Sequence, residues 1–196
     1  MIKLLLGVCG NLGSGKTCTL TFLGMYFYKR GHNIYANYKL NFKYSPIRSL
    51  EDIDNVKQGI FLGDELWGWI DARASVSEKN KQIAKILLRS RKRGVDIFYT
   101  AQHFKQMDIR VRRITDMLLF PELYPNGKCK VSFFNVFGDR IRKPIFYNAN
   151  KIFNLYDTTE EVKDVEGFEG RRAVKMLREI QAIEKLKRLG IKIPND

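Results

Sequence analysis

A glycine-rich segment near the start of the chain has residue types suited to holding phosphate. Residues 10–17 follow the pattern G-x-x-x-x-G-K-[ST], with an apolar run before them and a helix-forming run after them. Glycines let the backbone wrap around an anion, and the N-terminus of the following helix adds partial positive charge. Lys16 is expected to reach the β- and γ-phosphates, and the Thr17 hydroxyl to ligate Mg²⁺. The sequence therefore predicts a nucleoside triphosphate site formed by Gly10, Asn11, Leu12, Gly13, Ser14, Gly15, Lys16, Thr17 and Cys18.

Two adjacent carboxylates, Asp64 and Glu65, stand at the end of a second apolar run, which begins at residue 59. A carboxylate at the carboxyl end of a buried parallel strand faces the crevice in which ligands of open α/β sheets bind. Asp64 is predicted to hold Mg²⁺, which neutralises charge that develops on phosphate. Glu65 is predicted to orient and deprotonate an attacking water.

A polar amide, Gln102, follows a third apolar run, at residues 95–100. If this strand lies between the strands that precede the two motifs above, Gln102 lies beside the γ-phosphate. There it would sense the phosphate or position the water. The neighbouring His103 is expected to be structural.

Several arginines are candidates for a residue that acts on the nucleotide of a neighbouring subunit, where it would stabilise the transition state. A basic cluster ends the predicted helix at residues 78–91, and the helix macrodipole favours cations there without any catalytic role. Arg91 is the first candidate. Its rivals are Arg73, Arg89 and Arg113, and the sequence does not choose among them.

The chain carries a net charge of +14, and the excess lies before residue 157. Residues 1–156 hold 26 basic and 12 acidic side chains, and residues 79–113 hold eleven basic and two acidic ones. Such a surplus favours binding to a polyanion through neutralisation of phosphates and release of counterions. Beside a nucleotide motif, we favour double-stranded DNA, bound without sequence preference, over a merely solvated basic face.

The composition sets further bounds. At 196 residues, with 44% hydrophobic side chains, the chain is long enough for one domain with a sizeable core. It has no apolar stretch of about 18 residues, so no membrane span is expected. Cys9, Cys18 and Cys129 are scattered, which favours a reducing compartment over a disulfide framework or a zinc site.

The order of the apolar segments predicts an α/β fold, with a mostly parallel sheet flanked by helices. Strands are expected at residues 2–8, 33–38, 59–64, 95–100 and 115–120, the last of them ended by Pro121. Helices are expected at residues 18–28, near 49–53 and at 78–91. Alternating residues predict a β-hairpin within residues 127–148. The core would span residues 1–156, and a polar helical tail would span residues 157–196.

Taken together, these segments resemble a known family. Residues 10–17, 61–73 and 89–102 are similar to the HerA/FtsK-type ATPases. Within that group they most resemble the genome-packaging ATPases of tailless icosahedral double-stranded DNA viruses, including archaeal ones. The similarity covers roughly residues 3–160. It implies a RecA-like P-loop core with the two nucleotide motifs on non-adjacent strands, and ATP and Mg²⁺ as cofactors.

The resemblance also implies an activity. The family forms homo-oligomeric rings, usually of five or six subunits, that hydrolyse ATP and push DNA through a central channel. On this comparison Lys16, Thr17, Asp64, Glu65 and Gln102 match the phosphate-binding, magnesium, catalytic and sensor positions. Viral capsid proteins would be partners. The protein would act in the cytoplasm of the infected host cell, at the capsid, and association with the virion is a further expectation.

Three other functions stay open at the level of the sequence. A filamentous-phage-assembly ATPase of the zonula-occludens-toxin type shares the core, although such proteins usually carry a membrane segment. A nucleotide or small-molecule kinase is disfavoured by Glu65, which a kinase does not need, and by the basic residues. A DNA-binding scaffold that uses nucleotide only as a switch is the third alternative.

Overall fold

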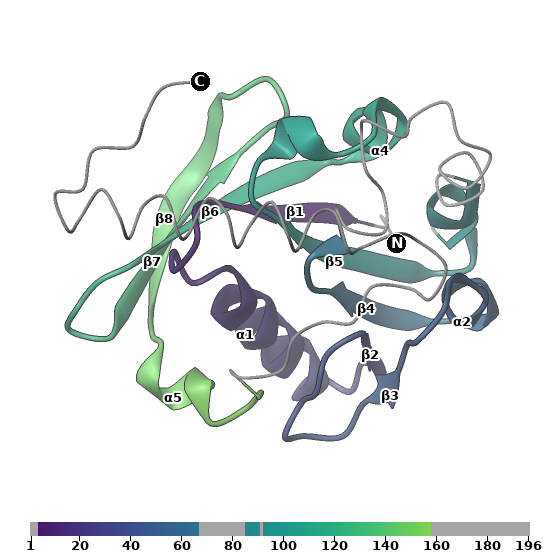
Figure 1. The fold of residues 1–196 in the computed structure, drawn as a ribbon, viewed down its shortest axis with the longest axis horizontal. Helices are drawn as coiled ribbons and strands as arrows, with labels where there is room; N and C mark the ends of the chain where they lie inside the picture. Colours follow the sequence, from purple (N-terminus) through teal and green to yellow (C-terminus); the bar gives the residue numbers. More distant parts are fainter. Residues whose placement is uncertain (1–3, 67–84, 91, 158–196) are drawn as a thin grey trace, which may run out of the picture. The chain divides into compact units, whose positions relative to one another are not determined.

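The computed structural model describes residues 4–66, 85–90 and 92–157 (Figure 1). Contacts divide the chain into two units, Met1–Lys163 and Asp164–Asp196, and every described residue belongs to the first. The predicted helical tail lies outside the described residues. Of the helix predicted at residues 78–91, residues 85–90 are described, and they are helical.

The strands of the described chain form one eight-stranded sheet in the order β3-β2-β4-β5-β1-β6-β7-β8 (Figure 1). Every neighbouring pair from β3 through β6 in this order is parallel. The pairs β6–β7 and β7–β8 are antiparallel. The α/β class, the mostly parallel sheet and the hairpin are thus confirmed. The strands are β1 Leu5–Cys9, β2 Ile34–Ala36, β3 Ser45–Pro46, β4 Gly59–Gly63, β5 Val95–Ala101, β6 Met117–Leu123, β7 Lys128–Phe134 and β8 Arg140–Asn148.

The parallel strands β1, β4 and β5 form the buried centre of the sheet. Every residue of β1 and β4 is buried, as is all of β5 except Asp96. Strands covered on both faces are continuously apolar rather than alternating. This is why the runs around residues 5–9 and 59–63 were recognisable in the sequence.

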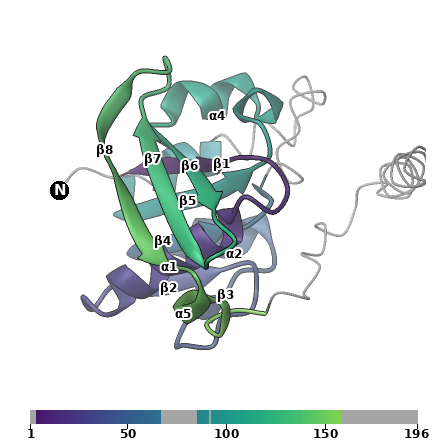
Figure 2. The same cartoon turned by 90° about the vertical axis from the view of Figure 1, so that its left-hand side faces the viewer.

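The helices α1 and α4 lie on opposite sides of the sheet (Figure 2). On α1 the ring of Phe22 stacks on Tyr147 of β8, with centroids 4.3 Å apart. A Cβ at Gly24 would collide with Leu62 of β4, so glycine lets the helix approach the sheet closely. The labelled segments are α1 Lys16–Tyr28, α2 Leu50–Asn55, the 3-10 helix η3 Phe104–Gln106, α4 Ile109–Ile114 and α5 Asn150–Phe153. Among the residues described, no helix is both long enough and apolar enough to cross a bilayer.

Two features differ from the sequence prediction. The strand expected to end before Pro121 continues through it to Leu123, because Pro121 pairs with Val131 of β7 and lies beyond Leu119, where pairing with β1 ends. A proline is tolerated where a strand lacks a ladder on one side. The two-residue strand β3 was not anticipated, and neither were the short helices η3, α4 and α5. Each of these helices spans six residues or fewer, too short for a helical period to stand out.

Candidate nucleotide site

The loop between β1 and α1 has the backbone geometry of an anion cradle. Gly10, Gly13 and Gly15 have φ angles of 155°, 78° and 92°, and Gly15 is the N-terminal cap of α1. Glycine adopts such angles without the steric penalty of a Cβ. At Gly10 a Cβ would also lie 2.6 Å from Oγ of Ser14. The loop can therefore close around a phosphate and direct backbone N–H groups toward it.

Ser14 supplies an independent sign of an anion site. Its Oγ is buried and has no hydrogen-bond partner among the residues that the structure describes. Buried hydroxyl groups normally have a partner. A hydroxyl without one inside a glycine loop fits a phosphate oxygen as its acceptor.

Lys16 projects over the same loop. Its Nζ donates a hydrogen bond to the carbonyl oxygen of Asn11 at 3.0 Å. Burial lowers the pKa of the Lys16 ammonium, while the nearby carboxylates of Asp64 and Glu65 raise it. A partly desolvated ammonium next to the loop is placed to bind the anionic oxygens of a triphosphate.

Asp64, which directly follows β4, is a buried carboxylate held by two threonine hydroxyls. Thr17 Oγ1 donates at 3.0 Å to Oδ2, and Thr100 Oγ1 donates at 2.6 Å to Oδ1. Burial raises the pKa of the Asp64 carboxyl, against the hydrogen bonds from Thr100 and Thr17 and the charge of Lys16, which lower it. Burial therefore penalises the ionised form of this carboxylate, and a cation bound beside it would offset that penalty.

The donor set fits Mg²⁺. Thr17 and Asp64 offer hard oxygen atoms within 3.0 Å of each other, the type of ligand that Mg²⁺ prefers. In the described ranges there is no cluster of three or more His, Cys, Asp or Glu side chains for a metal. Mg²⁺ needs no such cluster, because it keeps several waters and is completed by substrate phosphates.

Glu65 has an unusual backbone conformation. Its φ of 47° is the only positive φ at a non-glycine residue in the described part of the chain. Such a conformation carries a strain of about 1–3 kcal/mol and persists only where the surroundings enforce it. The exposed Glu65 side chain follows Asp64 directly, so the strain falls at the residue predicted to act as the base.

The structure places β5 between β1 and β4, which is the arrangement on which the Gln102 prediction depended. The Gln102 carbonyl oxygen accepts a hydrogen bond from the Gly10 N–H at 3.2 Å. A cavity of about 1170 Å³ borders this contact through Gly10, Asn11, Ser14 and Gln102, but it extends along η3, β6 and β7 and is not lined by Lys16, Thr17, Asp64 or Glu65. Gln102 therefore lies against the phosphate loop, and its role as a sensor stays a prediction.

The trans-acting arginine is not assigned by the structure. Arg91 and Arg73 lie outside the described residues, and Arg89 and Arg113 are exposed. Two further arginines of the basic region hold the fold together instead. Arg93 pairs with Asp54 of α2 at 2.6 Å, and the Nε of Arg112 donates to the Met107 carbonyl oxygen at 3.0 Å.

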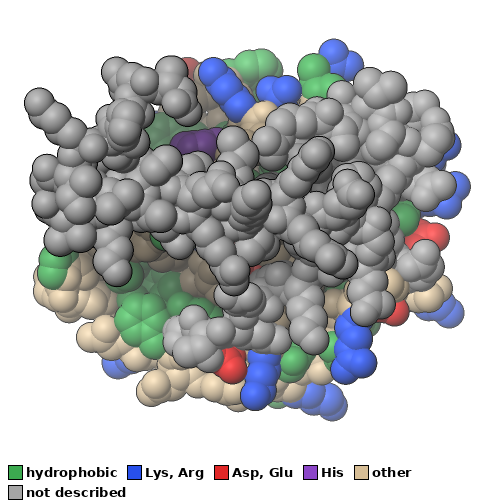
Figure 3. Space-filling view, in the orientation of Figure 1, with side chains coloured by type: hydrophobic (Ala, Val, Ile, Leu, Met, Phe, Trp, Pro, Cys, Tyr) green, Lys and Arg blue, Asp and Glu red, His purple; other side chains and the backbone are tan. Residues whose placement is uncertain are grey.

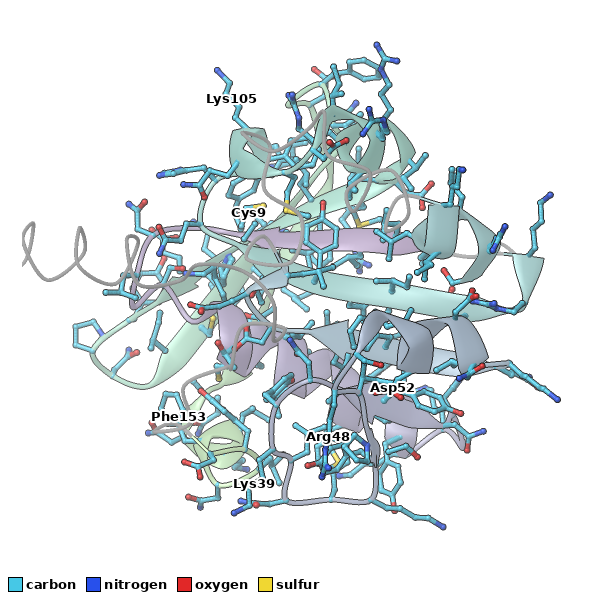
Figure 4. All side chains as sticks on the ribbon, turned by 45° about the vertical axis from the view of Figure 1, so that its right-hand side comes forward. Cys9, Lys39, Arg48, Asp52, Lys105 and Phe153 are labelled. Atoms are coloured by element: carbon cyan, nitrogen blue, oxygen red, sulfur yellow. The ribbon has the colours of Figure 1, made fainter. Side chains whose placement is uncertain are left out.

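The cysteines near the site are buried and not poised as nucleophiles. Cys9 is labelled at the end of β1 in Figure 4, and burial raises the pKa of its thiol to about 12, although the charge of Lys16 lowers it. Burial likewise raises the pKa of Cys18 to about 11. The Cys18 side chain packs in the core, so only its backbone is available to a nucleotide.

Sequence reasoning missed two residues of this network, Asn37 and Thr100. The Asn37 side chain bonds both backbone polar atoms of Asp64, and Thr100 links Asp64 to the Glu65 N–H. Both lie at the carboxyl ends of the two parallel strands that flank β4, which was the available signal. Neither belongs to a recognisable motif, so the strand order had to be known first.

Several solved structures share the fold of this chain. The N-terminal domain of zonular occludens toxin from Neisseria meningitidis matches with a TM-score of 0.59 at 18% identity, over 80% of this chain and 100% of that one. The genome packaging NTPase B204 of Sulfolobus turreted icosahedral virus 2, bound to ATP-gammaS, matches with a TM-score of 0.52 at 10% identity, over 74% and 96%. The flagellar accessory protein FlaH from Methanocaldococcus jannaschii gives 0.51 at 15% identity, over 75% and 85%. The chain has the fold of P-loop NTPases.

At these identities the likeness extends to the fold alone. No family model matches the sequence, and no curated protein matches it either. Within the P-loop fold, the motifs of this chain lie where the ligand crevice of a parallel sheet is expected.

Proposed function

We propose that the protein is a Mg²⁺-dependent ATP hydrolase that uses hydrolysis to move double-stranded DNA into a viral capsid. The observation that carries the enzymatic part is the convergence of three elements at one edge of the sheet. The glycine loop with Lys16, the Thr17–Asp64 pair at 3.0 Å and the strained Glu65 meet at the carboxyl ends of β1 and β4.

The chemistry follows from these positions. Glu65 accepts a proton from a water as its oxygen attacks the γ-phosphorus, the bond to the bridging oxygen breaks, and ADP and phosphate leave. Lys16 and the loop N–H groups stabilise the charge on the phosphate oxygens. Mg²⁺, held by Thr17 and Asp64, neutralises charge on the β- and γ-phosphates when bound. Gln102 senses the γ-phosphate or orients the water.

The proposal that the protein moves DNA rests on its positive charge. The chain carries a net charge of +14, and Lys and Arg side chains are spread around the periphery of the face in Figure 3. Neutralisation of phosphates by such residues gives binding that is largely independent of sequence. A homo-oligomeric ring, an arginine supplied by a neighbouring subunit and a capsid partner complete the proposal, with the host cytoplasm as the place of action.

The test is phosphate release with and without double-stranded DNA, for the wild type and Glu65→Gln. We expect DNA to stimulate release, and Glu65→Gln to lower turnover by at least about 100-fold while nucleotide still binds. Equal rates in both proteins would refute Glu65 as the base. Rates indifferent to DNA would refute the translocase and leave a hydrolase.

A filamentous-phage-assembly ATPase is the second candidate. It is favoured by one observation, the similarity to the N-terminal domain of zonular occludens toxin over 80% of this chain. A triplex-displacement assay separates the two functions. In this assay, a motor that moves along duplex DNA removes a triplex-forming oligonucleotide bound to it. ATP-dependent displacement supports packaging. Hydrolysis without displacement supports the assembly ATPase.

A further inference from the structure

The peptide group between Asp64 and Glu65 is held from both sides by side chains of neighbouring strands. We propose that Asn37 is a positioning residue that, together with Thr100, holds Glu65 in its left-handed conformation and so aims the Glu65 carboxylate at the attacking water. This inference rests on the proposed function, in which Glu65 is the base.

Asn37 follows β2 directly and continues the pairing of β2 with β4 through its side chain. Its Oδ1 accepts from the Asp64 N–H at 2.7 Å, and its Nδ2 donates to the Asp64 carbonyl oxygen at 2.8 Å. Its own N–H donates to the Leu62 carbonyl oxygen at 3.3 Å. The regular ladder ends at the pair Ala36–Leu62, so the Asn37 amide replaces the backbone bonds that would come next.

Thr100 of β5 holds the same peptide group from the other strand. Its Oγ1 accepts from the Glu65 N–H at 2.7 Å and donates to Oδ1 of Asp64 at 2.6 Å. The carbonyl oxygen and the N–H of the Asp64–Glu65 peptide group are therefore both bonded, one from the end of β2 and one from β5. This fixes the plane of the peptide group on the N-terminal side of Glu65, and the buried side chain of Leu66 anchors the chain on its other side.

With the chain anchored on both sides, Glu65 keeps a φ of 47°. An L-residue in this region relaxes toward negative φ unless its surroundings prevent it. Relaxation would swing the Glu65 side chain away from its present direction. Loss of either bond should therefore misplace the base, and a misplacement of about 1 Å lowers a rate by up to about 100-fold.

Asn37 offers the cleaner test, because among the described residues its side chain bonds only backbone atoms of Asp64. The set formed by Thr17, Thr100 and the Asp64 carboxylate stays intact without it. Removing Asn37 should therefore lower turnover while nucleotide binding is kept. A bond that merely closed the end of β4 would instead change stability and leave turnover of the folded protein unchanged.

The first experiment compares Asn37→Ala with Asn41→Ala. The exposed Nδ2 of Asn41 donates to the Asn154 carbonyl oxygen at 2.8 Å, and this bond lies outside the site. We expect Asn37→Ala to lower kcat by about 10- to 100-fold, with KM for ATP and the Kd of a non-hydrolysable analogue within about threefold. Asn41→Ala should behave as the wild type. An unchanged kcat in Asn37→Ala, or a Kd that weakens in step with kcat, would overturn the inference.

The second experiment uses the hydroxyl of Thr100. Thr100→Ser keeps the hydroxyl and Thr100→Val removes it at similar volume, so Thr100→Val should lose at least about tenfold more turnover than Thr100→Ser. Thr21→Val removes another buried hydroxyl, which pairs with Tyr38 at 3.0 Å, and serves as the control. Equal losses in Thr100→Ser and Thr100→Val would contradict the role of the hydroxyl.

A double variant separates failure of this inference from failure of the proposed function. If Asn37 acts through Glu65, adding Asn37→Ala to Glu65→Gln should lower kcat no further, because the base is already gone. Multiplicative losses would show that Asn37 acts elsewhere. Wild-type turnover in Glu65→Gln alone would instead refute Glu65 as the base.

Discussion

The parallel half of the sheet and its antiparallel half differ in how far they bury their side chains. β1 and β4 are buried along their whole length, and the polar side chains at the carboxyl ends of the parallel strands bond one another. On β8, by contrast, residues 140–143 are all exposed, and Phe146 keeps 62% of its surface accessible. The first half fixes a few groups in place, whereas the outer strand β8 of the second presents side chains to solvent.

The physical reason for the difference is the environment of the polar groups. In the parallel half, Asp64 is 7% exposed, so a hydrogen bond to it is stronger than in water and its loss is more costly. On the exposed strand β8, Arg140 and Arg142 are solvated cations that rest on the rings of Phe134 and Phe133. We therefore expect the two halves to respond differently to substitution.

The largest effect is expected from Lys16→Ala. In the proposed function this change removes the ammonium that binds the phosphates, and phosphate release should fall by at least about 1000-fold. Lys128→Ala, at an exposed position of β7, is the matched control and should keep its rate. A stopped assay for released phosphate, with circular dichroism to verify folding, measures both. Comparable losses of phosphate release in Lys16→Ala and Lys128→Ala would contradict the difference between the two halves of the sheet.

Asp64→Asn should abolish Mg²⁺-dependent hydrolysis and yet stabilise the protein without nucleotide. The raised pKa of Asp64 means that its ionised form is penalised by folding. The gain in stability of Asp64→Asn over the wild type should thus be absent at acid pH. It should appear as the pH rises through 3.8, the pKa of the Asp64 carboxyl in the unfolded chain, toward its raised pKa in the folded protein.

Thermal denaturation at several pH values measures this. We expect the variant to gain roughly 2–4 °C in Tm near neutral pH, the shift that about 1 kcal/mol produces in a chain of this size. Mg²⁺ with an ATP analogue should raise the Tm of the wild type alone. A variant that is less stable than the wild type at neutral pH would contradict the buried-charge argument.

Gly24→Ala tests the packing under the parallel half. Alanine favours helix over glycine by about 1 kcal/mol, but here its Cβ would collide with Leu62. We expect a net destabilisation of about 1–3 kcal/mol, because overpacking outweighs propensity. Chemical denaturation gives the free energy of unfolding, with Tyr26→Ala, on the exposed side of α1, as control. A gain in stability would mean that α1 and β4 move apart at little cost in free energy.

The smallest effect on chemistry is expected from replacing Arg140, Arg142 and Lys143 together by serine. Hydrolysis without DNA should stay within about twofold of the wild type, since these side chains belong to the other half. DNA affinity should fall and depend less on salt, as the net charge drops from +14 to +11. Filter binding at several salt concentrations measures this. A large loss of basal turnover would place the hairpin in the catalytic site.

Local patterns explain how much could be predicted. The loop at residues 10–17 was readable because its glycine-rich spacing stands between a strand and a helix, and its three positive φ angles agree. The hairpin was readable because its residues alternate on either side of a turn. The path of β6 through Pro121 was predicted wrongly, since a proline is judged locally, while its tolerance depends on which strands lie beside it.

The sequence by itself determined the phosphate loop, the acidic pair and the α/β class, because each depends on residues close together in the chain. Only the tertiary structure decided that β5 lies between the two motif strands, and that Asn37 and Thr100 hold the peptide group of the acidic pair. Those residues are 27 and 35 positions from their partners. No local spacing encodes such contacts, since they exist only once the order of the strands is set.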